Sequence, residues 1–377
     1  MRKLPIGIQN FKELRTENYY YVDKTLFVKQ LVEGGKYYFL SRPRRFGKSL
    51  FLDTLKQAFS GNKPLFEGLY LEKNWDWNIK YPVIHISFGE GVIEDEKDLE
   101  KRIQQILRDN AKNLNLAFQE EYDNRYFFIQ LIREACKKYD QKVVVLVDEY
   151  DKPILDNLTQ KEKAVKIREK LKDLYSVIKD SDEYLKFAFL TGVSKFGKIS
   201  SFSGLDITLD PRYGTLSGYT EKELAETFQD RLEGVNLEEV RRWYNGYSWL
   251  GEKVYNPFDI LLFLREKQFR PYWFETGTPS FLIQLLQEKK YYLPDLENLK
   301  ASELLLGSFE IERIPIETLL FQTGYLTITG TLEFEDQRIF ELAYPNKEVK
   351  ISLMNSFLED LLQNPTEKEN TKQSFFL

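Results

Sequence analysis

The stretch Leu40-Ser-Arg-Pro-Arg-Arg-Phe-Gly-Lys-Ser-Leu50 follows a short apolar run and leads into apolar residues at helical spacing. The run 37–40 predicts a strand, and Leu52, Leu55 and Phe59 predict a helix. A strand that passes through a turn ending in Gly-Lys-Ser and then opens a helix is the context that a phosphate-binding loop needs. The sequence therefore predicts an anion site in this turn.

The chemistry of such a loop depends on its last residues. Backbone N–H groups of the turn and of the helix N-terminus point at the anion, Lys48 adds a positive charge, and the Ser49 hydroxyl can reach a Mg²⁺ ion. The usual pattern, G-x-x-x-x-G-K-[ST], has glycine where this chain has Arg42. Because a side chain forced to positive φ costs about 1–2 kcal/mol, we expect the first turn to differ from the glycine form.

The composition is that of a globular protein with two or three domains. The chain has 377 residues, of which 42% are hydrophobic and 30% charged. Its net charge of −5 provides no overall positive field for nucleic acid, although residues 36–48 hold cations and no acid. The single cysteine, Cys136, excludes an internal disulfide, and no apolar run has signal-peptide or membrane-spanning length. We therefore expect a cytoplasmic protein.

A second motif follows the clearest strand of the chain. The run Lys142-Val-Val-Val-Leu-Val-Asp148 shows no polar alternation, which predicts a strand buried on both faces of a parallel sheet. It ends in Asp148-Glu149, at the edge where open α/β sheets bind ligands. Asp148 can hold Mg²⁺ directly or through water, and Glu149 can orient and deprotonate an attacking water. The alternative is that both acids only cap the next element, but the phosphate loop upstream favours the functional interpretation.

Four further residues extend the candidate site. Thr191 ends the next predicted strand, where its hydroxyl could sense the terminal phosphate or simply be a polar group leaving the sheet. Arg42, Arg44 and Arg45 could clamp phosphate oxygens or reach a neighbouring subunit. The alternative for the arginines is an exposed basic turn. Their place inside the loop favours phosphate or acidic partners.

Other polar residues are weaker candidates. Lys195 and Lys198 could face the phosphates, but a solvated turn is the simpler interpretation. For Asp151, a structural role or a salt bridge is the favoured interpretation. His85, the only histidine, falls within a predicted strand and favours a core or sheet position. A metal site built on His and Cys clusters is therefore excluded.

The order of predicted elements indicates the domain organisation. Strands at about 37–40, 82–88, 142–148, 185–191 and 205–209 alternate with helices, which predicts a doubly wound α/β domain over residues 1–215. Residues 216–345 predict a smaller helical or winged-helix-like lid. Its expected elements are helices at about 221–232, 237–244, 257–267 and 279–288 and a hairpin of 325–329 and 332–335 around Gly330-Thr331. Residues 346–377 are expected to be a polar tail.

Several motifs occur in a fixed order along the chain. They are Tyr21-Val-Asp-Lys-Thr25, Ser41-Arg-Pro-Arg-Arg-Phe-Gly-Lys-Ser49, Leu146-Val-Asp-Glu-Tyr-Asp151, Thr191-Gly192 with Phe202-Ser-Gly-Leu205, Trp243-Tyr-Asn-Gly-Tyr247, Tyr255-Asn-Pro257, Gly324-Tyr-Leu326 and Pro345-Asn-Lys-Glu-Val349. Together they resemble the AAA-ATPase-like family of prokaryotic proteins, whose members often carry a C-terminal PD-(D/E)XK nuclease-like domain. The resemblance spans about residues 4–350.

The resemblance implies an ASCE-type P-loop NTPase fold, with strand 186–191 between the phosphate-loop strand and strand 143–148, and a lid after the core. It implies that Arg-Pro-Arg-Arg-Phe-Gly-Lys-Ser is the family's usual Walker A loop. The expected nucleotide-binding residues are Arg42, Pro43, Arg44, Arg45, Phe46, Gly47, Lys48, Ser49, Leu50 and Thr191. Ser49 and Asp148 are the expected Mg²⁺ ligands, and Glu149, in the Walker B segment, is the expected catalytic residue.

Longer members of the family continue past the last motif into the nuclease-like domain. Here residues 350–377 follow it, so we expect a short member or a truncated chain, a tail that is a remnant of the link, and no nuclease activity.

The leading interpretation is an ATPase that binds ATP and Mg²⁺ and whose nucleotide state moves the lid. One alternative is an interaction module that binds nucleotide without hydrolysing it. Another is action on nucleic acid through the lid, around Arg241-Arg-Trp-Tyr-Asn-Gly-Tyr247, in a defence or mobile-element setting. Phosphate release separates the first two, and salt-dependent binding would be needed for the third. The sequence leaves open whether the protein partner is a second copy or another chain.

Overall fold

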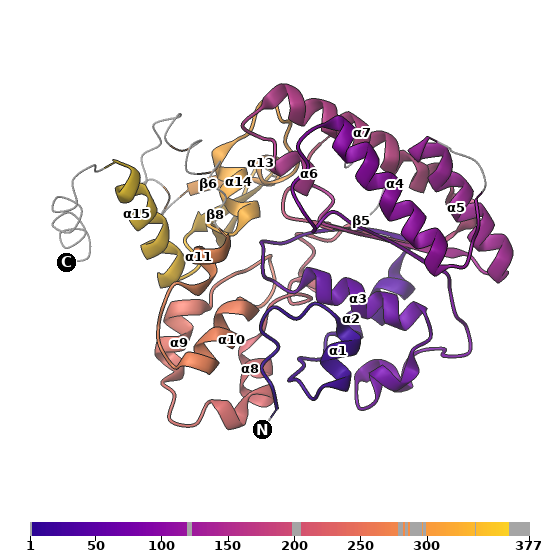
Figure 1. The fold of residues 1–377 in the computed structure, drawn as a ribbon. Helices are drawn as coiled ribbons and strands as arrows, with labels where there is room; N and C mark the ends of the chain where they lie inside the picture. Colours follow the sequence, from indigo (N-terminus) through magenta and orange to yellow (C-terminus); the bar gives the residue numbers. More distant parts are fainter. Residues whose placement is uncertain are drawn as a thin grey trace.

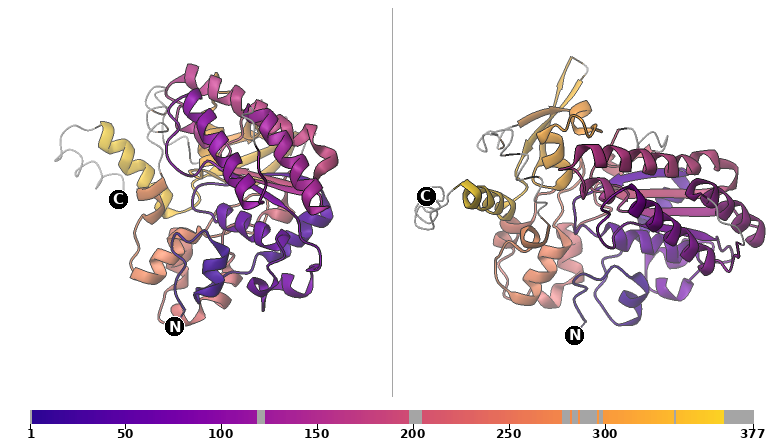
Figure 2. Two further views of the ribbon diagram at one scale, coloured as in Figure 1. Left: turned by 45° about the vertical axis from the view of Figure 1, so that its right-hand side comes forward. Right: turned by 45° about the horizontal axis from the view of Figure 1, so that its top comes forward.

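The chain forms a parallel sheet between two layers of helices (Figures 1 and 2). This computed structural model describes residues 2–118, 123–197, 205–277, 299–335 and 337–361 and the single positions 282, 286 and 296. The 5-stranded sheet has the order β2-β3-β4-β1-β5. Its strands are β1 (Tyr37–Ser41), β2 (Val83–Ser87), β3 (Val143–Asp148), β4 (Leu185–Gly192) and β5 (Leu205–Asp206). The predicted α/β P-loop fold is confirmed, including β4 between β1 and β3.

Helices cover both faces of this sheet (Figure 1). One face carries α4 (Glu96–Asn113), α5 (Asn124–Tyr139) and α7 (Lys161–Asp180), and the other carries α1 (Phe11–Thr16), α2 (Thr25–Gly34) and α3 (Lys48–Phe59). Alternate residues of β3 pack into the two separate hydrophobic clusters, with Val145 on one side and Val144 on the other. Burial on both faces explains why this strand shows no polar alternation.

Local sequence explains where the helices near the site begin and end. The Asp95 side chain accepts a hydrogen bond from the backbone N–H of Asp98 at 2.9 Å and so caps α4. Asp123 caps α5 in the same way. Helix α2 ends at Gly34 and is followed by Gly35. These caps satisfy backbone donors that have no partner within their own helices.

A second region follows the sheet domain. Its helices are α8 (Glu221–Thr227), α9 (Leu237–Tyr244), α10 (Pro257–Glu266), α11 (Tyr272–Gly277), α13 (Glu303–Leu306), α14 (Ile316–Thr323) and α15 (Lys347–Leu361). An antiparallel sheet of order β6-β8-β7 joins them, with β6 (Leu299–Ser302), β7 (Thr327–Phe334) and β8 (Gln337–Ala343). We call residues 216–361 the C-terminal region. None of the helices in the described part of the chain is long and apolar enough to cross a membrane.

The structure corrects three sequence expectations in and before this region. The hairpin around Gly330-Thr331 is wrong, because β7 runs through Gly330 and its turn follows Phe334; a register shift next to Gly330 keeps the strand continuous. The strand expected at 205–209 is only the two residues of β5. Residues 347–361, within the segment expected to be a polar tail, form the helix α15.

Two other expectations concern the helix 279–288 and the domain boundaries. The expected helix 279–288 lies outside the described residues except at positions 282 and 286. The domain boundaries after residues 215 and 345 stay predictions. One of the hydrophobic clusters of buried side chains nevertheless runs from the sheet, through Phe46, to Tyr247, Trp249 and Trp273 of the C-terminal region.

Candidate functional site

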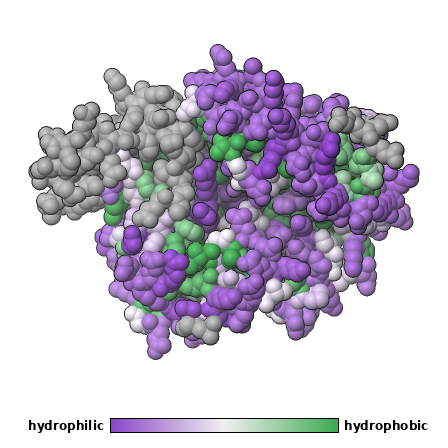
Figure 3. All heavy atoms as spheres, viewed as in Figure 1, coloured by the Kyte–Doolittle hydropathy of each residue, from purple (hydrophilic) through white to green (hydrophobic). Residues whose placement is uncertain are grey.

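A cavity of about 640 Å³ opens at the phosphate loop. This volume lies within the range of small-molecule binding sites, roughly 300–1,000 Å³. Its lining includes Arg44, Arg45, Phe46, Gly47, Lys48, Ser49, Leu50 and Glu149 of the predicted site. The surface is mainly hydrophilic in Figure 3, with a hydrophobic area in the region of α10, whose Pro257, Phe258 and Leu261 also line the cavity.

The loop takes its shape from two residues with left-handed backbone. Gly47, at the N-cap of α3, has a φ of 81°, and a Cβ placed on it would meet no atom within 4 Å. Glycine is therefore favoured here by backbone conformation and not by lack of space. The other is Arg45, with a φ of 67°. Arg42 is not among the residues with positive φ, so the first turn differs from the glycine form as expected, and the strained side-chain position in this loop is Arg45.

Lys48 begins α3 and is only 6% exposed. Its Nζ donates to the backbone carbonyls of Arg42 at 2.9 Å and Pro43 at 2.8 Å. Burial lowers the pKa of Lys48, and the charges of Glu149 and Asp148 oppose that shift. The ammonium group therefore lies in the field of both acidic residues and is held by groups that a bound phosphate could replace.

Arg42 is fully buried, and its guanidinium is bound by protein groups. It donates to the carbonyls of Ser41 at 2.9 Å, Thr208 at 2.9 Å and Tyr213 at 3.2 Å. Burial lowers the pKa of Arg42 to about 9, which leaves it charged at neutral pH. Its side chain does not line the cavity, so the expected phosphate clamp is corrected to a structural anchor. Pro43 is also outside the cavity lining.

Asp148 and Thr191 meet where β3 and β4 end. Asp148, 5% exposed, accepts hydrogen bonds at Oδ1 from the Thr191 hydroxyl at 2.8 Å and from the Glu149 backbone N–H at 3.0 Å. Both are buried and neither lines the cavity. Glu149 does line it, with a φ of 51°, and its carboxylate lies beside Gly89. The turn thus directs Glu149 to the cavity and keeps Asp148 behind it.

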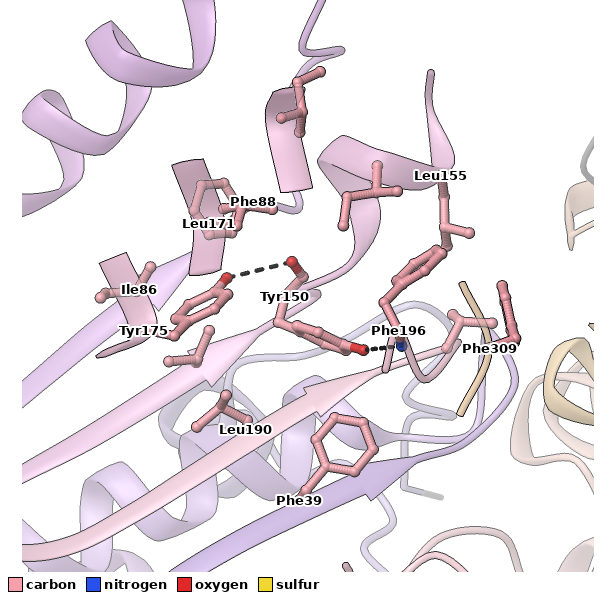
Figure 4. Close-up of a cluster of buried hydrophobic side chains, with 14 of the residues drawn as sticks. Phe39, Ile86, Phe88, Tyr150, Leu155, Leu171, Tyr175, Leu190, Phe196 and Phe309 are labelled. Carbon is pink, nitrogen blue, oxygen red and sulfur yellow. Dashed lines mark hydrogen bonds between the residues drawn. The ribbon is translucent and has the colours of Figure 1, made fainter. Parts of the chain in front are cut away.

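The residues after Glu149 are structural. Asp151 is fully buried and accepts from the backbone N–H groups of Val193 at 3.0 Å and Ser194 at 2.6 Å. Burial raises the pKa of Asp151 to about 6. The Tyr150 hydroxyl accepts from the backbone N–H of Phe196 at 3.1 Å, in the buried cluster of Figure 4. These contacts hold the turn after β3 against the chain that follows β4.

Lys195 and His85, two further residues considered from the sequence, do not line the cavity. Lys195 is buried, and its Nζ forms an ion pair with Asp206 at 2.6 Å. It does not line the cavity, and Lys198 lies outside the described residues. His85 is in β2, and burial lowers its pKa.

Some of the residues that line the cavity were not predicted from the sequence. The N-terminal segment contributes Tyr20, Tyr21, Val22 and Lys24, and the C-terminal region contributes Ser217, Gly218 and Tyr219 as well as α10. The Lys24 Nζ forms an ion pair with Glu223 at 2.6 Å, which joins these two walls. The motifs at 21–25 and 255–257 fall in these two walls of the cavity, but neither motif contains a residue pattern that predicts contact with a ligand.

Comparison with known proteins agrees with this architecture. The family described as "Predicted AAA-ATPase" (AAA-ATPase-like) matches residues 5–202. This range contains the phosphate loop after β1 and Asp148-Glu149 at the end of β3. The chain belongs to the AAA-ATPase-like family. A relative from Azotobacter chroococcum mcd 1, named "Uncharacterized protein in vnfD 5'region", is 54% identical over 369 residues, covering 97% of this chain and 71% of its own length. Family membership and strand order together make this chain a protein of the P-loop ATPase type.

Among solved structures, the Aeropyrum pernix ORC1 protein in complex with DNA aligns with 90% of this AAA-ATPase-like chain and 93% of its own. The alignment has 12% sequence identity and a TM-score of 0.33. A TM-score of this size does not establish a shared fold.

A pair of buried acids lies in the C-terminal region of this family member. Asp259 of α10 and Glu348 of α15 are both fully buried, and Glu348 accepts from the backbone N–H of Trp273 at 2.8 Å. Burial, and then the charge of Glu348, raise the pKa of Asp259 well above its usual value. The folded protein therefore keeps a proton that the unfolded chain releases above about pH 3.9.

Replacing Asp259 with asparagine is expected to flatten the decline of stability with pH. An acid whose pKa is raised by folding stabilises the folded state fully at pH values below its pKa in the unfolded chain. This stabilisation is lost as pH rises toward the pKa in the folded protein, at about 1.4 kcal/mol per pH unit. In thermal melting from pH 5 to 9, the melting temperature of Asp259→Asn relative to that of the wild type should increase as pH rises. Glu238→Gln, at an exposed carboxylate of α9, is the control. Parallel wild-type and Asp259→Asn curves would contradict the expectation.

Proposed function

We propose that the chain binds Mg²⁺–ATP in this cavity and hydrolyses it, and that nucleotide state acts on the C-terminal region. One observation carries the proposal: Lys48, Ser49 and Glu149 line the same cavity, at the carboxyl end of a parallel sheet. Hydrogen bonds from Lys48 to phosphate oxygens would replace its present hydrogen bonds to the carbonyls of Arg42 and Pro43. The backbone N–H groups at the start of α3 would bind the same anion.

The oxygen groups fit a magnesium ion that arrives with the nucleotide. Ser49, which lines the cavity, has a hydroxyl of the hard kind that Mg²⁺ prefers, and the buried Asp148 carboxylate behind the cavity would hold the ion through water, with phosphates supplying other ligands. In the described ranges no group of three or more His, Cys, Asp or Glu residues could hold a metal ion. The ion would neutralise charge on the phosphates, and Asp148 would be oriented by Thr191.

Glu149 is the group placed to act on water. Its carboxylate lines the cavity, while its backbone N–H is held by Asp148. In the proposed reaction it accepts a proton from the attacking water and orients that water toward the terminal phosphate. Lys48 stabilises the charge that develops on the phosphate oxygens.

Calorimetric titration of the wild type with ATP tests binding and its metal dependence. We expect saturable heat with Mg²⁺ present, and an ATP affinity lower by at least roughly tenfold, about 1.4 kcal/mol, when EDTA removes the ion. Malachite-green detection of phosphate then tests turnover. Absence of binding under both conditions would refute the proposal. Binding without phosphate release would favour the second candidate, a non-hydrolysing interaction module.

The cellular role in this proposal is a conformational switch in a cytoplasmic protein, with a second copy or another chain as its partner. Action on nucleic acid is less favoured. The net charge is −5, and Arg241, in the basic segment of α9, forms an ion pair with Glu221 at 2.9 Å.

A further inference from the structure

Every residue from Arg42 to Phe46 contacts the C-terminal region. The Arg42 guanidinium lies 4.1 Å from the centre of the Trp249 ring, and the Arg45 guanidinium lies 4.7 Å from the Phe258 ring. Such cation–aromatic contacts are strongest where water is excluded, as at Arg42. These contacts give Arg42 and Arg45 a structural role at the boundary with the C-terminal region.

The other three residues of this segment make close contacts. Phe46 packs edge-to-face on Tyr247 at 4.7 Å and on Trp249 at 5.4 Å between ring centres. The Trp273 indole Nε1–H donates to the carbonyl of Arg44 at 3.1 Å.

Gly324 supplies the contact for Pro43. A Cβ added at Gly324 would lie 2.7 Å from the Pro43 ring, and its φ of 93° is also unfavourable for other residues. Glycine therefore allows the segment 324–326 to approach the loop this closely.

Lys48 connects these contacts to the cavity. In the structure its ammonium group donates to the carbonyls of Arg42 and Pro43, the residues that contact Trp249 and Gly324. An ammonium group has three donors and two of them bind these carbonyls, so a phosphate that accepts more than one hydrogen bond from Lys48 would compete with the carbonyls. Phosphate binding would thus change the hydrogen bonding of the segment that contacts the C-terminal region.

We propose that Trp249 and Trp273 are positioning residues, which hold the loop in the conformation that binds phosphate and through which nucleotide occupancy reaches the C-terminal region. The inference rests on the nucleotide binding proposed above. None of Tyr247, Trp249, Trp273 and Gly324 lines the cavity, so they act through the loop. Because coupling between two sites is reciprocal, weakening these contacts weakens nucleotide binding, and bound nucleotide changes the protection of these segments.

Trp273→Phe tests the coupling with a small change. It removes the indole N–H that binds the Arg44 carbonyl and keeps an aromatic ring. Trp243→Phe, on α9, is the matched control, because its indole N–H donates to Glu239 at 2.9 Å. In calorimetry with Mg²⁺–ATP, we expect the affinity of Trp273→Phe to fall about 3- to 10-fold, as for the loss of one ordinary hydrogen bond, and that of Trp243→Phe to change less than about 2-fold.

Amide hydrogen exchange supplies a readout that a purely structural role would not change. In the wild type, Mg²⁺–ATP should slow exchange in residues 245–273, and in nucleotide-saturated Trp273→Phe this slowing should be smaller. Equal affinities for both variants, together with no nucleotide effect on exchange in the wild type, would overturn the coupling while leaving nucleotide binding intact. A wild type that binds no nucleotide would instead refute the proposed function. If Trp273→Phe does not fold, the wild-type exchange result decides.

Discussion

Lys48→Ala is expected to weaken Mg²⁺–ATP binding by roughly 100-fold. Lys48 lines the cavity as the first residue of α3, where its charge and the backbone N–H groups would act on the same phosphates. Loss of charge-assisted hydrogen bonds costs about 1.5–3 kcal/mol, and 3 kcal/mol corresponds to somewhat more than a hundredfold in affinity. Titration calorimetry measures this change directly.

The change at Lys48 needs a control for the loss of one charge from α3. Lys56 lies further along the same helix and does not line the cavity, so Lys56→Ala should bind nucleotide with nearly wild-type affinity. Lys48→Ala also removes the donor to the carbonyls of Arg42 and Pro43, and its melting temperature should be recorded alongside. Equal, weak heats for the wild type and Lys48→Ala would show that this loop binds no nucleotide.

Glu149→Gln is expected to bind Mg²⁺–ATP within about 2-fold of the wild type and to lose turnover by about 10²- to 10⁴-fold, the usual contribution of a general base. The amide keeps the shape of the side chain but cannot accept a proton from water. Steady-state phosphate release, measured with saturating nucleotide, separates this loss from any change in binding.

A nearby carboxylate provides the comparison for Glu149. Glu90 is exposed, belongs to the chain segment after β2 and does not line the cavity, so Glu90→Gln should keep its turnover. If Glu149→Gln hydrolyses ATP as fast as Glu90→Gln, Glu149 is not the base. If the wild type itself releases no phosphate, the non-hydrolysing module is the better description.

The sequence predicted the parts of the fold that depend on local patterns. The apolar run of β3 predicted a strand covered on both faces, and both faces are covered. Gly47-Lys48-Ser49 predicted the start of α3, because glycine and the change of periodicity mark that point. Asp148-Glu149 was predicted at a strand end, and β3 ends at Asp148. These features follow from spacing along the chain alone.

What the sequence could not predict depends on contacts between distant segments. Nothing next to Arg42 indicates that the carbonyls of Thr208 and Tyr213 bind its guanidinium, so phosphate seemed its natural partner. The expected turn at Gly330-Thr331 failed because pairing with β8 carries the strand through the glycine. The ion pair of Lys24 with Glu223, which joins two cavity walls, connects residues nearly two hundred positions apart.

The hydrophobic cluster that runs through Phe46 has a consequence for dissecting the molecule. A chain cut after residue 215 would expose the faces of Phe46 and Arg42 that Tyr247 and Trp249 now cover. It would also remove Glu223 and leave the buried ammonium of Lys24 without its carboxylate. The phosphate loop is thus built jointly by both halves, and the ATPase half is not a module that can be excised with its loop intact.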